Sequence, residues 1–459
     1  DELIYVIEIF LNLLKIQRVE GGQTSEEGEG VEDETTSVHA QVTGIYQYKP
    51  SYRSPYVSGN SLSPLTDHAY TVTNTYFFGV RPFKNTEIFF NPEVTMGVPF
   101  AGGLVGLGGF YNGEITRTAG VVPKAYRQRL FLRQTLNLDG ETEKLEADAN
   151  QHAMVVSKNR FVITAGNFST LDIVDDNAYA KDPRMQFMNW GNMTYAAYDY
   201  AADARGYGWG IFGEWYQNDW VLRFGRMTPP KDPNMLPIDS AFLKHYGDQV
   251  EIEHGYQLDG RPGKARLLVY RNRQILARFD DARALLGATC SSSPIGGNAT
   301  IFCARNREQI KYGIGVNLEQ EFTDNWGGFM RYMWSDGKTE TLAFTEVDHS
   351  LSIGAVVKGT SWKRGQDRVG FAYLRNELSS ARRQYLEAGG MSFFIGDVAP
   401  TNSSSVFHYS AEQIGEFYYS WFFNKYLQLT ANYQRIYNPA YNKDRGPVDI
   451  YGVRLHAEF

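Results

Sequence analysis

The feature of this sequence that most constrains its fold is a regular alternation of apolar and polar residues. Successive side chains of a β-strand point to opposite faces of the sheet. The alternation therefore predicts strands with one apolar face and one charged or polar face. The closing segment shows it most cleanly: Tyr451, Val453, Leu455, Ala457 and Phe459 alternate with Gly452, Arg454, His456 and Glu458.

Similar segments recur along most of the chain. We count about 16 segments of ~10 residues, an even number of the kind that bacterial outer-membrane barrels require. Connections such as 217–219, 323–325 and 424–425 are short, whereas 98–124, 169–206, 275–306 and 379–412 are long. Short turns that alternate with long loops are expected when the two rims of a barrel face different compartments. The predicted strands begin near Ala40, Tyr70, Glu87, Ala125, Asn159, Tyr207, Trp220, Gln249, Ala265, Gln309, Trp326, Thr345, Arg368, Gln413, Tyr426 and Val448.

The composition excludes several other classes of protein. No run of 18 uncharged apolar residues exists, so membrane-spanning helices are excluded, and 66 aromatic residues are too many for a disordered chain. Two cysteines exclude a disulfide-built scaffold, and a net charge of −7 argues against nucleic acid. A soluble β-sandwich also alternates, but here the second face is too charged to form a core. The sequence therefore predicts an all-β transmembrane antiparallel barrel.

The N-terminus differs from the rest of the chain. Ile4, Ile7, Leu11 and Leu14 are spaced for an amphipathic helix, and residues 20–34 form an acidic, Gly-rich linker. We therefore divide the chain into a helix and linker at 1–38 and a barrel at 39–459. The helix could dock a periplasmic partner or self-associate, or the segment could be a processed or mobile terminus.

Two parts of the predicted barrel are candidates for function. A barrel of this size encloses a water-filled channel, and rings of charge set selectivity in channels. By alternation, Arg127, Arg129 and Arg133 on one strand, together with Arg223, face the lumen, although inward charges can also merely solvate the wall. The connection 169–206 is too long for an ordinary turn. Folded inward, its Tyr and Trp rings would stack on sugars while its Asp, Asn and Arg side chains bind hydroxyl groups.

The same loop carries motifs that resemble a known family. The runs DNAYAKDPRMQFMNWG (176–191) and AYDYAADARGYGWG (197–210) are similar to the OprB-type carbohydrate-selective porins. The resemblance continues through RLFLRQTLNLDGE (129–141), NLEQEFTD (317–324), NPAYNKDRGPV (438–448) and the closing GVRLHAEF, and it covers about 39–459.

This resemblance implies a 16-stranded barrel in the outer membrane of a Gram-negative bacterium, with loops folded into the lumen. It implies passive diffusion of small carbohydrates or similar polar solutes, without enzymatic activity or a cofactor. Its partners would be these solutes, the outer-membrane lipid and the barrel-insertion machinery, which reads a terminal aromatic such as Phe459. The matching motifs supply these candidate constriction or loop-anchoring residues: Asp176, Asp182, Arg184, Asn189, Trp190, Asp199, Asp203 and Arg205.

Other interpretations remain open at this stage. A polysaccharide-export or envelope-complex barrel would use the N-terminal helix to dock its partner. A hydrolase is weakly supported, because His152 and Ser157 have no carboxylate placed with them. The Asp-rich start of the long loop could collect Ca²⁺, although it lacks the spacing of a recognised Ca²⁺ loop. Cys290 and Cys303 lie in one long connection and are expected to form a structural disulfide.

Overall fold

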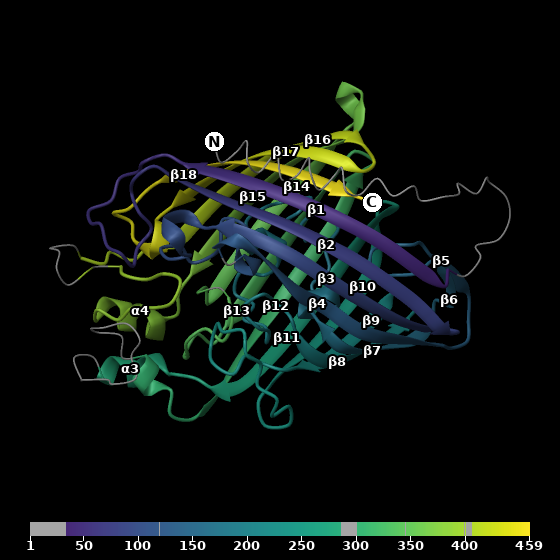
Figure 1. The fold of residues 1–459 in the computed structure, drawn as a ribbon, viewed down its shortest axis with the longest axis horizontal. Helices are drawn as coiled ribbons and strands as arrows, with labels where there is room; N and C mark the ends of the chain where they lie inside the picture. The colour runs from purple at the N-terminus through teal and green to yellow at the C-terminus, as the bar shows by residue number, and fades with distance from the viewer. Residues whose placement is uncertain (1–33, 119, 286–300, 345, 399, 401–405) are drawn as a thin grey trace.

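The computed structural model describes residues 34–459 except 119, 286–300, 345, 399 and 401–405. Within these residues, sixteen strands form one closed antiparallel barrel, in which β1 pairs with β18 (Figure 1). The predicted fold class and strand number are thus confirmed. The predicted N-terminal helix, most of the acidic linker and Cys290 lie outside the described residues.

The barrel strands are longer than their connections at one rim. They are β1 (Thr36–Lys49), β2 (Asp67–Phe83), β3 (Thr86–Val98), β4 (Gly120–Asn137), β7 (Arg160–Phe168), β8 (Gly208–Gln217), β9 (Trp220–Met227), β10 (Tyr246–Leu258), β11 (Arg261–Ile275), β12 (Glu308–Thr323), β13 (Trp326–Ser335), β14 (His349–Gly359), β15 (Arg364–Glu377), β16 (Glu412–Asn424), β17 (Leu427–Tyr437) and β18 (Val448–Glu458).

Short helices lie in the connections. The α-helices are α2 (Trp190–Met193), α3 (Phe279–Ala284) and α4 (Ser380–Glu387), and the 3-10 helices are η1 (Phe100–Gly102), η2 (Ile115–Arg117), η3 (Thr170–Asp172), η4 (Phe302–Ala304), η5 (Thr360–Trp362) and η6 (Pro439–Tyr441). No helix among the described residues is both long and apolar enough to cross a membrane.

The two rims of the barrel differ. The turns β2–β3, β8–β9, β10–β11, β12–β13 and β16–β17 each contain two residues and share one rim with the end of β18. The loops that carry α3 and α4 lie at the opposite rim (Figure 1). Because short turns face the periplasm in outer-membrane barrels, we call these the periplasmic and extracellular ends.

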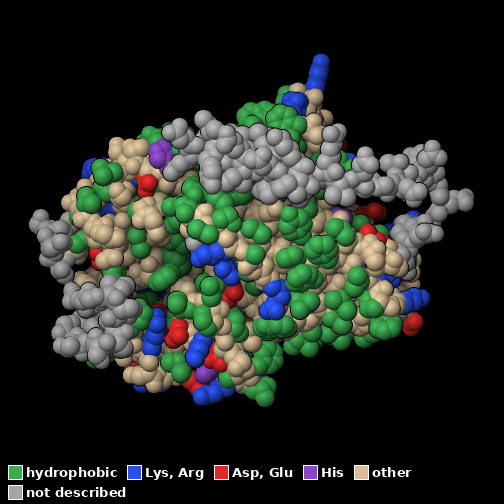
Figure 2. Space-filling model, viewed as in Figure 1, with side chains coloured by type: hydrophobic (Ala, Val, Ile, Leu, Met, Phe, Trp, Pro, Cys, Tyr) green, Lys and Arg blue, Asp and Glu red, His purple; other side chains and the backbone are tan. Residues whose placement is uncertain are grey.

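The alternation seen in the sequence separates an apolar outer wall from a polar interior. On β10 and β11, Ile252 and Leu267 are more than 40% exposed, whereas their neighbours Glu251 and Arg266 are buried. Hydrophobic side chains accordingly cover much of the visible wall (Figure 2). The low mean hydropathy of −0.40 thus averages over two opposite faces of the strands.

An outward charge near the middle of the wall should destabilise the barrel. Leu267 lies near the centre of β11 and is 43% exposed on the outer face. Leu267→Arg is expected to cost about 2–4 kcal/mol of unfolding free energy, because the guanidinium group would face hydrocarbon. Leu258→Arg, at the periplasmic end of β10, should cost about 0–1 kcal/mol. Urea titration in lipid vesicles measures both, and equal costs would contradict the placement of the wall.

One connection at the periplasmic end departs from the predicted short turns. Between β4 and β7, the strands β5 (Thr142–Leu145) and β6 (Met154–Ser157) form a separate antiparallel pair, which we call the periplasmic hairpin. The Arg160 guanidinium pairs with Glu143 at 2.6 Å, and Arg133 donates to the Asn150 carbonyl at 2.8 Å. The hairpin is therefore tied to the strands on both sides of it.

Candidate functional site

The segment 169–207, which we call the inner loop, fills much of the barrel interior. It begins with a capped turn at Ser169, whose side chain accepts from the Leu171 N–H. Trp190, Tyr195 and Tyr198 are each 0–1% exposed and belong to the main buried cluster with inward-facing wall residues. Small residues at 196–197 and 201–202, all alanine, let the loop backbone approach these rings closely. The aromatic residues of this loop therefore form a core.

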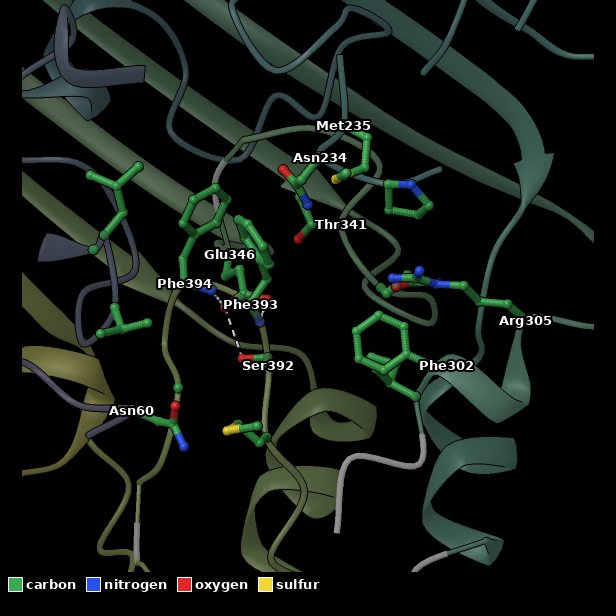
Figure 3. A pocket seen from close by; sticks show the side chains of 18 residues that line it. Asn60, Asn234, Met235, Phe302, Arg305, Thr341, Glu346, Ser392, Phe393 and Phe394 are labelled. Atoms are coloured by element: carbon green, nitrogen blue, oxygen red, sulfur yellow. Dashed lines mark hydrogen bonds and ion pairs between the residues drawn. The ribbon is translucent and has the colours of Figure 1, made fainter. Parts of the chain in front are cut away.

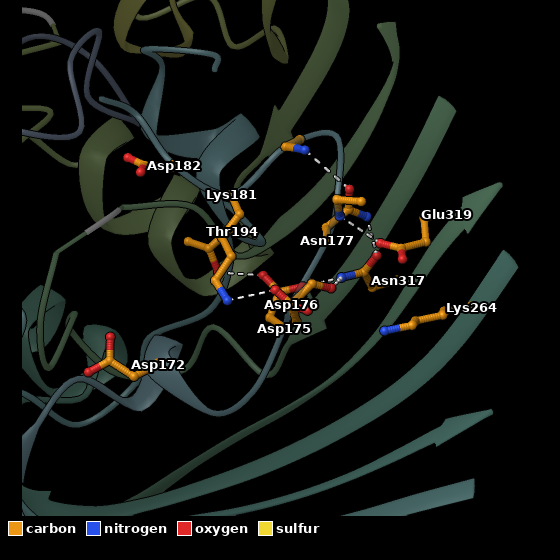
Figure 4. A network of polar contacts seen from close by, with 12 residues as sticks. Asp172, Asp175, Asp176, Asn177, Lys181, Asp182, Thr194, Lys264, Asn317 and Glu319 are labelled. Carbon is orange, nitrogen blue, oxygen red and sulfur yellow. Dashed lines mark hydrogen bonds and ion pairs between the residues drawn. The ribbon is translucent and has the colours of Figure 1, made fainter. Parts of the chain in front are cut away.

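Asp175 is the first of three polar anchors that hold the inner loop to the wall. Its carboxylate accepts from Arg331 Nε at 2.9 Å, Asn317 Nδ2 at 2.6 Å and Thr194 Oγ1 at 2.7 Å. Arg331 and Asn317 belong to β13 and β12, and all these groups are buried (Figure 4 shows Asp175 between the loop and the wall). A buried charge needs such complete pairing to be tolerated.

Asp199 forms the second anchor. It pairs with Lys311 of β12 at 2.7 Å, and it accepts from the backbone N–H groups of Leu342 and Ala343 at 2.8 and 2.7 Å. It thus joins the inner loop both to the wall and to the connection between β13 and β14.

The third anchor lies around Arg184 and Glu416. Arg184 pairs with Glu93 at 2.7 Å and with Glu114 at 2.8 Å. Glu416 of β16 accepts from the Met188 N–H at 2.6 Å and from Asn192 Nδ2 at 2.8 Å. These contacts clamp the loop before α2 and within it.

Other predicted loop residues serve local structure. Asp182 accepts from the Arg184 N–H at 2.7 Å, and Asp203 accepts from the Arg205 N–H at 2.9 Å, as Asp commonly does in turns. Asn189 caps α2 by accepting from Gly191 N–H. Arg184, Asn189, Trp190 and Asp199 are buried and support the loop. Asp182 is half-buried and also lines a cavity of about 530 Å³ between the inner loop and the wall.

Arg127 is not part of an inward arginine stripe, contrary to the prediction. In the pairing of β3 with β4, Asn91 faces Arg129 but Pro92 faces Arg127, so Gln128 is the extra residue of a β-bulge. Gln128 donates to the buried Glu93 carboxylate at 2.6 Å, and Tyr126 also donates to it. Arg127 lies between them and points outward.

The bulge places Tyr126 inside the barrel, in a cluster of tyrosine and arginine side chains. Arg129 and Arg117 lie 5.3 and 5.5 Å from the centre of the Tyr207 ring, and Arg117 Nε donates to the Tyr207 hydroxyl at 3.2 Å. Arg205 lies 4.2 Å from the centre of the Tyr126 ring. We call these five residues the Arg–Tyr cluster. The alternation pattern missed Arg117, Tyr126 and Tyr207, because their meeting depends on the bulge and on two loops.

A polar cavity of about 480 Å³, the lower chamber, lies between the inner loop and the periplasmic hairpin. Of the predicted residues, Arg129, Arg133, Arg223 and Asp176 line it. Arg223 is also paired with Glu214, Glu251 and Glu253 at 3.0–3.2 Å. The other residues that line the lower chamber include Glu87, Asp148, Asn150, Gln151, Arg160, Asp172, Lys181 and Tyr216. Paired cations and carboxylates of this kind offer hydrogen bonds to hydroxyl groups while leaving little net charge.

Two carboxylates of the chamber, Asp172 and Asp176, are paired with neighbouring cations. Lys181 donates to Asp176 at 2.6 Å, and this neighbouring ammonium group lowers the pKa of Asp176 well below its usual range. Arg129 makes a bidentate pair with Asp172, with both distances 2.7 Å. Asp176 therefore stays charged at neutral pH and remains a hydrogen-bond acceptor in the chamber.

A second cavity, the vestibule, opens among the extracellular loops. It has a volume of about 450 Å³ and is lined mainly by apolar side chains, including Leu104, Met235, Phe302, Phe393 and Phe394 (Figure 3). Its polar lining includes an Arg305–Glu340 pair with contacts of 2.7 and 2.6 Å. Ala204 N–H donates to the Met235 carbonyl at 3.2 Å, so the vestibule adjoins the residue before Arg205.

The alternative chemistries gain no geometric support. Asp172, Asp175, Asp176 and Asp182 each bind different partners. Figure 4 shows Asp172 and Asp182 well apart from Asp175 and Asp176. No group of three or more potential metal ligands occurs in the part of the chain that the structure describes. His152, in the connection between β5 and β6 of the hairpin, is buried and hydrogen-bonds Glu87 through Nδ1 at 3.0 Å. Cys303 is disulfide-bonded.

A closed barrel with an apolar outer wall, an anchored inner loop and cavities on both sides of that loop defines a porin of the Gram-negative outer membrane. The sequence profile of the carbohydrate-selective porin, OprB family, matches residues 95–459. The chain belongs to this family, whose members are channel proteins for small solutes.

A solved structure shows the same fold. The high-pH structure of OprB from Pseudomonas putida superposes with a TM-score of 0.64 at 14% identity, covering 93% of this chain and 94% of that one. The low-pH structure of the same protein gives a TM-score of 0.48 at 11% identity, with 93% of each chain covered. No curated protein sequence matches the chain.

Proposed function

We propose that small carbohydrates or similar hydroxylated solutes diffuse passively through the vestibule, past the Arg–Tyr cluster and into the lower chamber. The vestibule offers apolar and aromatic surface to the C–H faces of a sugar. The Arg–Tyr cluster and the chamber offer charged donors and acceptors to its hydroxyl groups. Weak binding at successive points suits conduction, because a tight site would trap the solute.

The observation that carries this proposal is the Arg–Tyr cluster. Its members come from β4, from the end of the inner loop and from the β3–β4 connection, and they converge beside Arg129, which also lines the lower chamber. Guanidinium groups and tyrosine rings together supply planar stacking surfaces and forked donors. The cluster is therefore the place where a sugar could be both stacked and hydrogen-bonded.

Arg205→Ala is the sharpest test of this role, because Arg205 stacks on Tyr126 without belonging to one of the loop anchors. Losing a charge-assisted hydrogen bond of about 1.5–3 kcal/mol should weaken sugar binding about tenfold or more. Glucose titration of the current through single channels in planar bilayers measures this binding as block. Wild-type channels should be blocked at millimolar glucose.

The matched control removes an arginine from the outer wall. Arg375 lies beside Glu377 on β15 and is exposed, so Arg375→Ala should leave the block unchanged. Wild-type current that persists at high sugar would contradict carbohydrate passage. Equal block in wild type and Arg205→Ala would instead remove the cluster from the route.

A further inference from the structure

The outer wall carries an apolar groove that the solute route does not use. The groove has a volume of about 500 Å³, and its outward lining includes Phe161, Ile163, Ile211, Phe224 and Val250 from β7 to β10. Gly213 of β8 lies at the floor of the groove, where the rings of Phe161 and Phe224 pack directly over its backbone. A Cβ atom at Gly213 would lie 2.9 Å from both Phe161 Cζ and Phe224 Cζ. Any larger side chain there would displace these rings or fill the groove.

Two arginines border the groove on its extracellular side. Arg226 makes a bidentate pair with Asp248, at 2.7 and 3.0 Å, and Arg271 contacts the same carboxylate at 2.8 Å. Both guanidinium groups lie over the Tyr246 ring, 3.9 and 5.3 Å from its centre. Ile211, Arg226, Asp248 and Arg271 are successive cross-strand partners, so they lie side by side on the outer face of four neighbouring strands. Two cations against one carboxylate leave a net positive charge there.

More cationic and aromatic side chains lie one step nearer the extracellular end. Arg127, turned outward by the β4 bulge, lies 4.9 Å from the centre of the Trp209 ring, and Trp209 precedes Ile211 by two residues on β8. Trp209 is 44% exposed on the wall. Tryptophan at this depth is typical of the boundary between hydrocarbon and headgroups. The arginines therefore lie at the headgroup level, and the groove lies below it, in the hydrocarbon.

We propose that this surface binds a phosphorylated glycolipid of the outer leaflet, with one acyl chain in the groove at Gly213 and a phosphate group at Arg226 and Arg271. An outward arginine is costly in hydrocarbon but tolerated near the interface, where phosphate is its natural bidentate partner. Asp248 holds the two guanidinium groups side by side and leaves one positive charge uncompensated. The groove would hold the acyl chain of the lipid, and the arginine pair would hold its phosphate group.

The test compares two lipids on the intact barrel. Native mass spectrometry of the detergent-purified protein, titrated with bisphosphorylated lipid A or with the same lipid stripped of phosphate, measures lipid retention directly. We expect the phosphorylated lipid to bind at least tenfold more tightly. Arg226→Gln combined with Arg271→Gln should reduce its binding to the level of the dephosphorylated lipid.

The matched control changes two other outward arginines, Arg375→Gln and Arg435→Gln, which also pair with carboxylates on the wall. This variant should bind as wild type does. Gly213→Leu should weaken both lipids equally, because it displaces the Phe161 and Phe224 rings that shape the groove and leaves the cations in place. Equal binding of the two lipids by wild type, or equal loss in the control, would overturn the proposal. Heat-modifiable gel migration confirms that each variant is a folded barrel.

Discussion

Asp175→Ala should release the inner loop from the wall and turn a restricted channel into a wider, noisier one. The substitution leaves the Arg331 guanidinium buried without its carboxylate, and it also removes the acceptor of Asn317 and Thr194. Breaking one side of a buried ion pair costs about 3–5 kcal/mol. That cost falls on the attachment of the loop, since the hydrogen-bonded barrel itself stays closed.

Two measurements report this release. Single-channel recordings should show a severalfold larger and more variable conductance than wild type. Trypsin, which is blocked while the loop is packed inside the barrel, should cleave after Lys181 or Arg184. Both residues lie in the stretch between the Asp175 and Asp199 anchors.

The control for this experiment is Asp324→Ala. Asp324 pairs with Arg261 in an exposed periplasmic turn, so its loss should change neither conductance nor proteolysis. A second variant, Asp175→Asn with Arg331→Met, removes both charges and should release the loop less than Asp175→Ala does. Wild-type conductance and protease resistance in Asp175→Ala would show that the inner loop does not depend on this anchor.

The barrel could be predicted from the sequence because its two faces meet different surroundings on every strand. Outward residues such as Leu267 and inward ones such as Arg266 differ in polarity, and the difference repeats with the period of the strand. Strand number and the long loops followed from this repetition. The inward position of most charges followed as well. Side chains alternate between the two faces of a strand, so once the apolar residues are placed outside, the charged residues between them must face inward.

The same argument explains why the predicted inward orientation of the Arg127 side chain was wrong. A bulge shifts the alternation by one residue, and no pattern within β4 itself records the shift. The signal was on the partner strand: Pro92 cannot donate to the sheet, and proline inside a strand commonly marks a bulge or an edge. The Arg–Tyr cluster could not be found without that correction, because it needs Tyr126 to point inward.

The roles of the inner-loop residues also depended on tertiary contacts. The motifs located Arg184, Asp199 and Arg205 in one loop. Their different roles become clear only from the residues that each of them contacts in the folded protein. Arg184 and Asp199 meet complementary wall charges and become anchors, whereas Arg205 meets the aromatic ring of Tyr126 beside the proposed solute route. The periplasmic hairpin escaped prediction because β5 and β6 have four residues each, too few to show a period.

That hairpin should act as the floor of the lower chamber. Leu145 and residues 148–151 line the chamber opposite the inner loop, and the hairpin is held by Arg133 and Arg160. Replacing residues 142–157 with Gly-Ser-Gly should therefore open the chamber to the periplasm. We expect a severalfold rise in single-channel conductance, together with weaker block by glucose added from the periplasmic side.

The control is a shortened turn elsewhere at the periplasmic rim. It distinguishes loss of the chamber floor from a general destabilisation of the barrel. Replacing residues 360–363, which contain η5 and do not line the chamber, with Asn-Gly should leave conductance unchanged. The hairpin deletion also removes the hydrogen bonds from His152 to buried Glu87 and leaves Arg133, 3.7 Å away, as a remaining partner. The deletion is therefore paired with Glu87→Gln, because a neutral amide costs less than a carboxylate when some of its hydrogen bonds are lost. Unchanged conductance in this folded double variant would contradict the role of the hairpin as a floor. Solute would then leave the chamber by a path that the hairpin does not restrict, and the narrowest point would lie at the Arg–Tyr cluster alone.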